Sequence, residues 1–387
     1  MKPLSGVPQR MTRSGIRVLM EIASRLPDVI HLEVGEPDFA TPEHIVDGAF
    51  EAVSAGFTKY TANAGLLSLR QAIVEKLARV NQLQRDVRHV IVTSGAVCAL
   101  GTSVLAVAEA GDEVLIPDPG WPNYESMVLL AHATPVRYPL DRAQAFMPDL
   151  DDLARRVTPR TKALLINSPS NPAGAVFTKE MVEELAAFAE RHDLYLISDE
   201  VYEELVFEGE HVSPARYERD GRVISIFGAS KTYAMTGWRL GYAVAPEPIA
   251  ALLEKLVEPL ISCASAISQK AAETALRGPQ ACVETFRRSY QRRRDLVVSL
   301  LEPDGLLATV PRGAFYALVD IGTSGMDSDT FARALLEESR VAVAPGATFG
   351  PQARQYVRIS FATQEQALVE GLTRLKAFLA KRKGGRA

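Results

Sequence analysis

The segment VISIFGASKTYAMTGWR, residues 223–239, joins a short apolar run to a turn of small residues that contains one lysine. The run at 223–227 is rich in β-branched and aromatic residues, which is typical of a strand covered on both faces. Lys231 follows that strand among small residues. A lysine desolvated in such a place loses its proton readily and becomes a nucleophile toward carbonyl carbon. A lysine that extends to the surface is the alternative, and the commoner arrangement for any single lysine.

Six similar runs flank this segment, at 89–93, 113–117, 135–139, 163–167, 195–198 and 240–245. Helical patterns such as 96–110 and 179–192 lie between them. Strands that alternate with helices favour βαβ units and a mostly parallel sheet. We therefore expect an α/β fold, with a large domain whose mostly parallel seven-stranded sheet is covered by helices.

The C-terminal part of the chain has a different pattern. Long polar helices near 280–301 and 364–382 flank short strands near 314–320, 340–344 and 356–361. This arrangement is typical of a smaller α+β domain.

The overall composition excludes several classes of protein. The chain has 387 residues, of which 47% are hydrophobic and 23% charged, so a disordered chain is excluded. The net charge of −4 gives no general attraction to nucleic acid or membrane surfaces. No uncharged apolar run approaches the roughly 18 residues that span a bilayer, and no secretory signal is visible. Scattered cysteines and histidines favour neither disulfides nor a metal site, so we expect a cytoplasmic enzyme without a metal.

Residues at the carboxyl ends of the expected strands are the first candidates for chemistry, because ligands of open α/β sheets bind there. Gly95, Ala96 and Val97 form a small-residue turn before a helix, which indicates either an anion site or an ordinary tight turn. Trp121 either packs in the core or stacks on a planar ligand. Asn171 lies in a proline-rich loop that would hold its amide in one direction, or is simply part of a turn.

Two charged residues and a phenol complete the set. Asp199 ends an apolar strand, where a carboxylate is costly unless a cation pairs with it. Tyr202 lies about one helical turn further on, and Arg239 can offer its planar guanidinium to a phosphate. A lysine that forms a Schiff base, together with a carboxylate for a pyridinium nitrogen, is the arrangement that pyridoxal phosphate requires.

The chain resembles the class I/II aminotransferases, the aspartate-aminotransferase-like branch of the fold-type I pyridoxal-phosphate enzymes. The resemblance runs from about Gly35 to Phe361 and depends most on three motifs, SKTYAMTGWR at 230–239, NPAG at 171–174 and DEVY at 199–202. It implies a ping-pong transfer of the α-amino group from an L-amino acid to a 2-oxo acid, through an internal aldimine on Lys231. It also implies a homodimer with shared active sites.

The resemblance further implies a domain division. We expect an N-terminal segment, 1–34, that joins the small domain, a large pyridoxal-phosphate-binding domain at 35–280, and a C-terminal small domain at 281–387.

Roles for individual residues follow from the same resemblance. Lys231 would move protons between Cα and the cofactor, Asp199 would pair with the ring nitrogen, and Tyr202 would bond the phenolic oxygen. Arg358 would grip the substrate α-carboxylate. The remaining cofactor and substrate contacts would come from Gly35, Tyr60 of the neighbouring subunit, Gly95, Ala96, Val97, Trp121, Asn171, Gly228 and Arg239.

Three positions depart from the family pattern. Val97 and Gly228 stand where hydroxyl residues often contact the phosphate, and Cys98 stands where glutamate or glutamine is frequent. The phosphate site would then depend on backbone amides and Arg239, so we expect weaker cofactor retention but not a lost site.

Other reactions on this scaffold remain open from the motifs alone. A carbon–sulfur β-lyase or a ring-forming synthase would use the same lysine, aspartate and arginine. A cofactor-sensing regulator is disfavoured because the segment before Gly35 is too short for a DNA-binding domain. No motif places a second cation for a dicarboxylate substrate, and Arg13 and Arg17 are expected to be solvated charges on an amphipathic helix. The balance favours a neutral or aromatic donor, with 2-oxoglutarate or pyruvate as acceptor.

Overall fold

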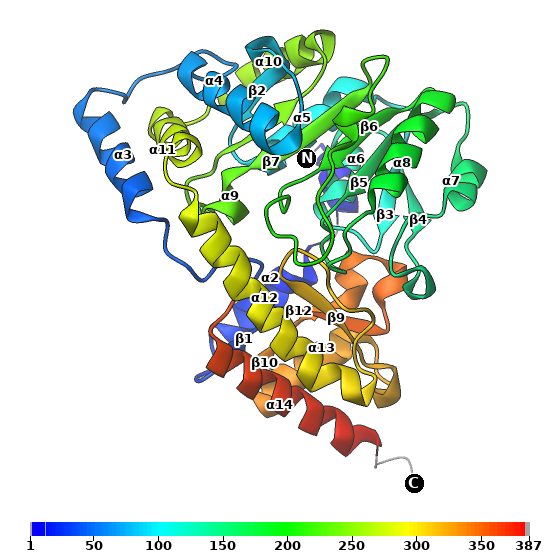
Figure 1. The fold of residues 1–387 in the computed structure, drawn as a ribbon. Helices are drawn as coiled ribbons and strands as arrows, with labels where there is room; N and C mark the ends of the chain where they lie inside the picture. Colours follow the sequence, from blue (N-terminus) through cyan, green and yellow to red (C-terminus); the bar gives the residue numbers. More distant parts are fainter. Residues whose placement is uncertain (1, 12, 384–387) are drawn as a thin grey trace.

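The computed structural model describes residues 2–11 and 13–383, and Figure 1 shows its two parts. The upper part is built on a seven-stranded sheet with strand order β2-β8-β7-β6-β5-β3-β4. All seven expected runs form its strands, so the prediction of the sheet is confirmed. The strands are β2 (Val90–Thr93), β3 (Glu113–Asp118), β4 (Thr134–Pro139), β5 (Thr161–Asn167), β6 (Tyr195–Asp199), β7 (Val223–Gly228) and β8 (Gly241–Val244).

Most strands of this sheet run parallel, so their carboxyl ends lie at the same edge. Strands β4, β3, β5, β6 and β7 pair in parallel, and only β8 runs antiparallel to its neighbours β7 and β2. Asn167 and Asp199 are register partners at the ends of β5 and β6, and Gly228 pairs with Gly241 next to them. Polar residues that are far apart in the sequence therefore meet at one edge of the sheet.

Helices cover both faces of this sheet because its strands are apolar on both sides. Along β7, Ile224 and Ile226 face one core cluster, whereas Val223 and Phe227 face another. The first cluster includes side chains of α5 (Ala96–Val107), α6 (Asn123–Leu130) and α10 (Glu247–Ile261). The second includes side chains of α3 (Glu43–Ser54), α4 (Leu67–Lys76), α7 (Leu150–Arg156), α8 (Lys179–Arg191) and α11 (Ala266–Arg277).

The lower part in Figure 1 combines α2 (Gly15–Ala23) and β1 (Ile30–His31) from the N-terminal region with the C-terminal segment. Strands β11 (Ala344–Pro345), β12 (Tyr356–Ser360) and β9 (Tyr316–Asp320) form an antiparallel sheet, and β1 pairs in parallel with β10 (Val341–Ala342). The single strand expected at 340–344 is therefore two short strands in different sheets, because the chain changes pairing partner at Val343. The surrounding helices are α2, α12 (Ala281–Leu301), α13 (Ser328–Ser339) and α14 (Glu365–Lys383).

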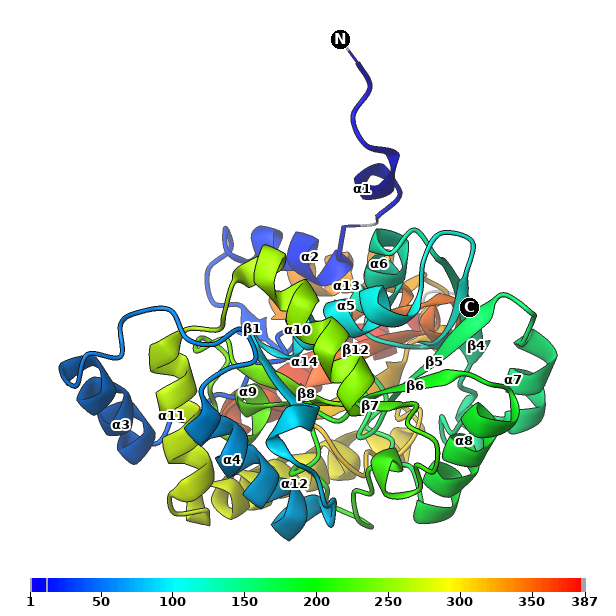
Figure 2. The ribbon, with the colours of Figure 1, turned by 90° about the horizontal axis from the view of Figure 1, so that it is seen from above.

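Helix α12 runs from one part into the other in Figure 1. In Figure 2 the short helix α1 (Gly6–Arg10) lies at the edge of the molecule, where it contacts α6. The division into domains at residues 34 and 280 stays a prediction. Within the described residues, no helix combines the length and the apolar character that crossing a bilayer requires.

Candidate active site

A cavity of about 690 Å³ lies at the sheet edge where Asn167, Asp199 and Gly228 meet. Eleven of the site residues that the sequence predicted line this cavity. Two indicated residues are not among its lining: Gly95 precedes the first turn of α5, and Tyr60 is 90% exposed on the surface. The indicated residues that line the cavity are Gly35, Ala96, Val97, Trp121, Asn171, Asp199, Tyr202, Gly228, Lys231, Arg239 and Arg358.

Lys231 lies in the single helical turn α9 (Ala229–Thr232), directly after β7. Its Nζ donates to the carbonyl oxygen of Gly35 at 2.7 Å, and no carboxylate of the described chain lies within ion-pair distance. Burial lowers the pKa of Lys231 to about 8, against the opposing effect of Glu36. The positive charges of Arg358 and Arg239 add to the lowering. The amine is therefore available in its neutral form near pH 8, as a base or nucleophile requires.

Asp199 lies buried at the end of β6, and its Oδ2 accepts a hydrogen bond from the Tyr124 hydroxyl at 2.6 Å. Burial raises the pKa of Asp199 to about 6, although the hydrogen bonds from Tyr124 and the Val201 amide oppose the rise. No lysine, arginine or histidine among the described residues forms an ion pair with it. A buried carboxylate of this kind suits a cation that belongs to a ligand.

Arg358 is a buried cation in the lining of the cavity. Its Nη1 donates to Asn171 Oδ1 at 3.1 Å, and its Nη2 donates to the carbonyl oxygen of Glu33. The guanidinium stacks over the Tyr316 ring, 4.3 Å from the centroid, and its Nε has no hydrogen-bond partner. A buried arginine without a carboxylate partner among the described residues fits an anionic ligand.

The start of α5 has the geometry that an anion site requires. Gly95 caps this helix at φ 76°, and a Cβ there would lie 2.7 Å from Arg239 Nη2. A Cβ at Gly241 would lie 2.3 Å from the amide nitrogen of Ala96. The two glycines therefore allow Arg239 and strand β8 to approach the free N–H groups at the helix start, where an anion is favoured.

The structure adds residues that the sequence did not indicate. Tyr124 bonds Asp199, and Tyr316 shares a hydrogen bond with Tyr202, with the two hydroxyl oxygens 2.8 Å apart. Tyr124 lies three residues after Trp121 at a helix start, and that spacing could have placed both on one face. No sequence pattern points to Tyr316, which β9 brings from the C-terminal part.

The N-terminal helix α2 also reaches the cavity. Ile16, Arg17 and Met20 are in its lining, together with Leu100 of α5. Among the described residues, no three histidine, cysteine or acidic side chains gather in a way that could hold a metal ion.

Comparisons with known proteins agree with this geometry. Residues 27–375 match the family model described as aminotransferase class I and II. An aspartate aminotransferase from Pyrococcus abyssi is 43% identical, over 96% of each chain. Aromatic-amino-acid aminotransferase 2 from Thermococcus litoralis is 40% identical, over 98% of this chain and 99% of the relative. A solved structure of a single mutant of Thermus thermophilus aspartate aminotransferase superimposes with a TM-score of 0.93 at 40% identity, covering 98% of this chain and all of its own.

Proposed function

Because the chain belongs to the class I and II aminotransferase family, it is an aminotransferase, and we propose that pyridoxal 5′-phosphate is its cofactor. In this proposal it moves the α-amino group of an L-amino acid to a 2-oxo acid by a ping-pong reaction. One observation supports it above all: the half-buried Lys231 and the buried Asp199 line one cavity, and neither has an oppositely charged partner among the described residues.

The residues present fit this cofactor. The N–H groups of Ala96 and Val97, with Arg239, would hold the phosphate, and the Trp121 ring would stack on the pyridine ring. Asp199 would pair with the protonated ring nitrogen, which removes the cost of burying its carboxylate.

The phenolic oxygen of the cofactor would meet two donors. Asn171 Oδ1 already accepts from Arg358, so its Nδ2 group is left to donate, and Tyr202 offers its hydroxyl beside it. When bound, pyridoxal phosphate supplies a carbonyl carbon for amines and a ring that takes up electrons from the substrate Cα.

The chain's own groups would bind the substrate and move its proton. Arg358 would take the α-carboxylate with its planar guanidinium, next to Gly35. Lys231, with its pKa lowered to about 8, would accept the proton from the substrate Cα and deliver it to C4′, the carbonyl carbon that the cofactor supplies. The buried Arg358 and the half-buried Lys231 would meet the substrate in a space with little water, which strengthens each contact and limits side reactions.

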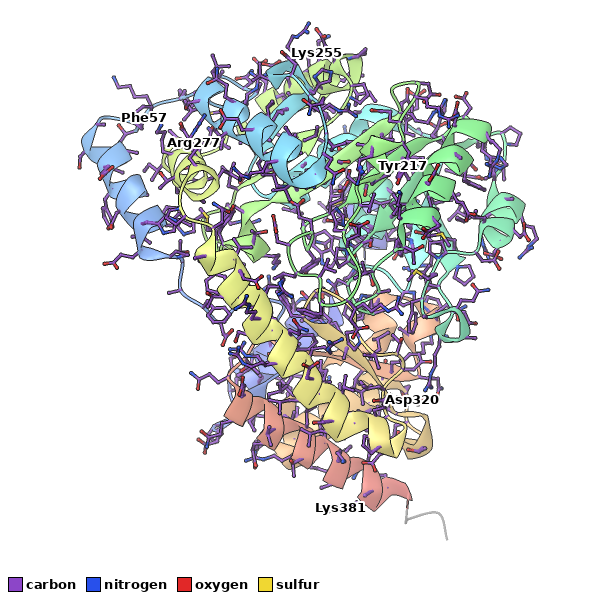
Figure 3. The ribbon with its side chains drawn as sticks, in the orientation of Figure 1. Phe57, Tyr217, Lys255, Arg277, Asp320 and Lys381 are labelled. Atoms are coloured by element: carbon purple, nitrogen blue, oxygen red, sulfur yellow. The ribbon has the colours of Figure 1, made fainter. Side chains whose placement is uncertain are left out.

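Replacing Lys231 with alanine tests the proposal. Lys231→Ala should abolish transamination and the pH-dependent visible absorbance of the bound cofactor, because no other amine lines the cavity in the described chain. Lys255→Ala is the matched control, since Lys255 is exposed on α10 at the periphery of the molecule (Figure 3). Normal turnover in Lys231→Ala would refute the assignment.

We also propose a homodimer with shared active sites, located in the cytoplasm. The segment 43–67 exposes several large apolar side chains, including Phe50 at 68%, Tyr60 at 90% and Leu67 at 56%. Phe57, which follows α3 at the edge of the molecule in Figure 3, belongs to the same segment. Contiguous apolar exposure of this kind marks an interface. Tyr60 would then be offered to the cavity of the second subunit.

A further inference from the structure

Two arginines of the N-terminal region, Arg13 just before α2 and Arg17 within it, have different surroundings in the structure. Arg13 forms an ion pair with the Glu21 carboxylate and is not among the cavity lining. Arg17, four positions later and inside α2, lies in the cavity lining together with Ile16 and Met20. Leu19 and Ala23 are buried on the same helix, so the helix is anchored to the C-terminal part.

Arg17 is the cation of this cavity that the proposed reaction does not use. The other three cations, Lys231, Arg239 and Arg358, have proposed roles as base, phosphate contact and α-carboxylate contact. Within the described residues, Arg17 forms neither an ion pair nor a hydrogen bond, and its side chain is exposed. A guanidinium held at a cavity without a partner is suited to a carboxylate that a ligand brings.

The wall beside Arg17 is apolar. Ile16 and Met20 come from α2, Val97 and Leu100 from α5, and the Trp121 ring completes the surface. Such a wall accommodates neutral and aromatic side chains through burial of apolar area. A ping-pong reaction passes both of its substrates through one cavity, so the same space must serve a donor and an acceptor of different chemistry.

We propose that Arg17 is a specificity-determining residue, which binds the side-chain carboxylate of dicarboxylic amino and oxo acids. The apolar wall takes uncharged side chains in the same space. Because Arg17 is exposed and makes no hydrogen bond or ion pair within the part of the chain that the structure describes, it can turn to solvent when an uncharged side chain enters, and no unpaired charge is buried. This inference rests on the proposed aminotransferase function, since it concerns the side chain of that reaction's substrates.

Two unreactive acids test it on the cofactor-loaded enzyme. Succinate has two carboxylates and 3-phenylpropionate has one, and neither carries an amino or oxo group, so binding is measured without turnover by titration calorimetry. Arg17→Gln should weaken the binding of succinate about tenfold or more beyond any change in the binding of 3-phenylpropionate. This is the loss expected for one charge-assisted hydrogen bond. Arg13→Gln, the matched control four positions earlier, should leave both affinities unchanged. Arg17→Lys should recover part of the succinate affinity, because it keeps the charge and loses the planar fork.

Two results would overturn the inference. Unchanged succinate binding in Arg17→Gln would show that Arg17 does not meet the second carboxylate. An equal loss of both probes would show that Arg17 only supports the cavity. Failure of the proposed function looks different: the unaltered enzyme would transaminate no donor in a panel of acidic, neutral and aromatic amino acids, whatever the two probes do.

Discussion

At the scale of single residues, the site is a set of charges withdrawn from solvent that form no ion pair within the described residues. Asp199 and Arg358 are buried and Lys231 is half-buried, and each contacts polar neighbours of the protein. Burial of unpaired charge costs free energy, which a ligand with complementary charges can restore. The residues should therefore make the cofactor-free protein less stable than its loaded form.

Asp199 should make the stability of the cofactor-free protein depend on pH. Its pKa of about 6 lies above its ordinary value near 4, so the folded protein holds the proton more tightly than the unfolded chain does. The free energy of unfolding of the cofactor-free protein should fall as pH rises from about 4 to 6, by about 3 kcal/mol in total. We expect Asp199→Asn to raise the Tm of the cofactor-free protein at pH 8 and to change it little at pH 4. Circular dichroism melts at the two pH values check this, and an equal Tm shift at both would contradict it.

Gly228 carries the prediction about cofactor retention. A Cβ there would meet Ala96 Cβ and the Leu240 carbonyl oxygen at 3.6 Å, which are ordinary contacts, so a serine side chain fits. Gly228→Ser should slow cofactor loss on dialysis about fivefold, because the hydroxyl adds a hydrogen bond to the phosphate. Gly228→Ala, which adds the methyl group without the hydroxyl, is the control. If serine and alanine retain the cofactor alike, the missing hydroxyl is not the cause of weak retention.

At the scale of elements, the contact between α5 and β8 positions the proposed phosphate site. Strand β8 runs antiparallel to β7, and its first residue, Gly241, faces the start of α5. Without a side chain there, the first amide groups of α5 lie close to the end of β7 and to Arg239. The position of a helix start against a strand thus decides where an anion can bind.

Gly241→Ala tests this contact. The added Cβ would lie 2.3 Å from the Ala96 amide nitrogen, so the start of α5 must shift away from β8. We expect a loss of about 1–3 kcal/mol in the free energy of unfolding and weaker cofactor binding. Denaturant titration and cofactor titration measure the two effects. Gly101→Ala within α5 is the control: its Cβ would meet only Met127 Cγ at 4.0 Å, and it should not weaken cofactor binding. Undiminished cofactor affinity in Gly241→Ala would count against this role of the contact.

At the scale of the whole molecule, the segment 43–67 exposes large apolar side chains, and helix α1, at the edge of the molecule, buries none of its residues. A second copy of the chain would cover this surface and would bring Tyr60 to the neighbouring cavity. Activity would then depend on association of two chains.

Phe50→Asp tests the proposed dimer. Phe50 is 68% exposed on α3, and a carboxylate there would be costly to bury between two chains. We expect the variant to sediment as a monomer and to lose activity on dilution at higher protein concentrations than the unaltered enzyme. Val369→Asp is the control, since Val369 is 37% exposed on α14 in the other part of the molecule. A monomer that stays fully active on dilution would contradict the shared site.

The seven strands of the sheet and eleven of the residues around the cavity were predictable from the amino-acid sequence. The strands and the residues that follow them are local properties, because β-branched runs form buried strands and the residues after parallel strands converge on one edge of the sheet. Gly35 and Arg358 were predicted from the resemblance to the aminotransferase family instead. The prediction of a single strand at 340–344 was wrong, because two short strands form there. Their partners β1 and β12 come from distant parts of the chain.

Which charged and polar groups meet depends on the packing of remote segments. This packing brings the Tyr124 hydroxyl to Asp199 across 75 positions and Arg358 to Asn171 across 187. It also separates Arg17, in the cavity lining, from Arg13, which pairs with Glu21. The physical reason is that the residue type of an arginine and its position in the sequence do not determine which groups lie opposite its side chain. That depends on how remote segments pack, and so does the burial that changes the pKa values of Lys231 and Asp199.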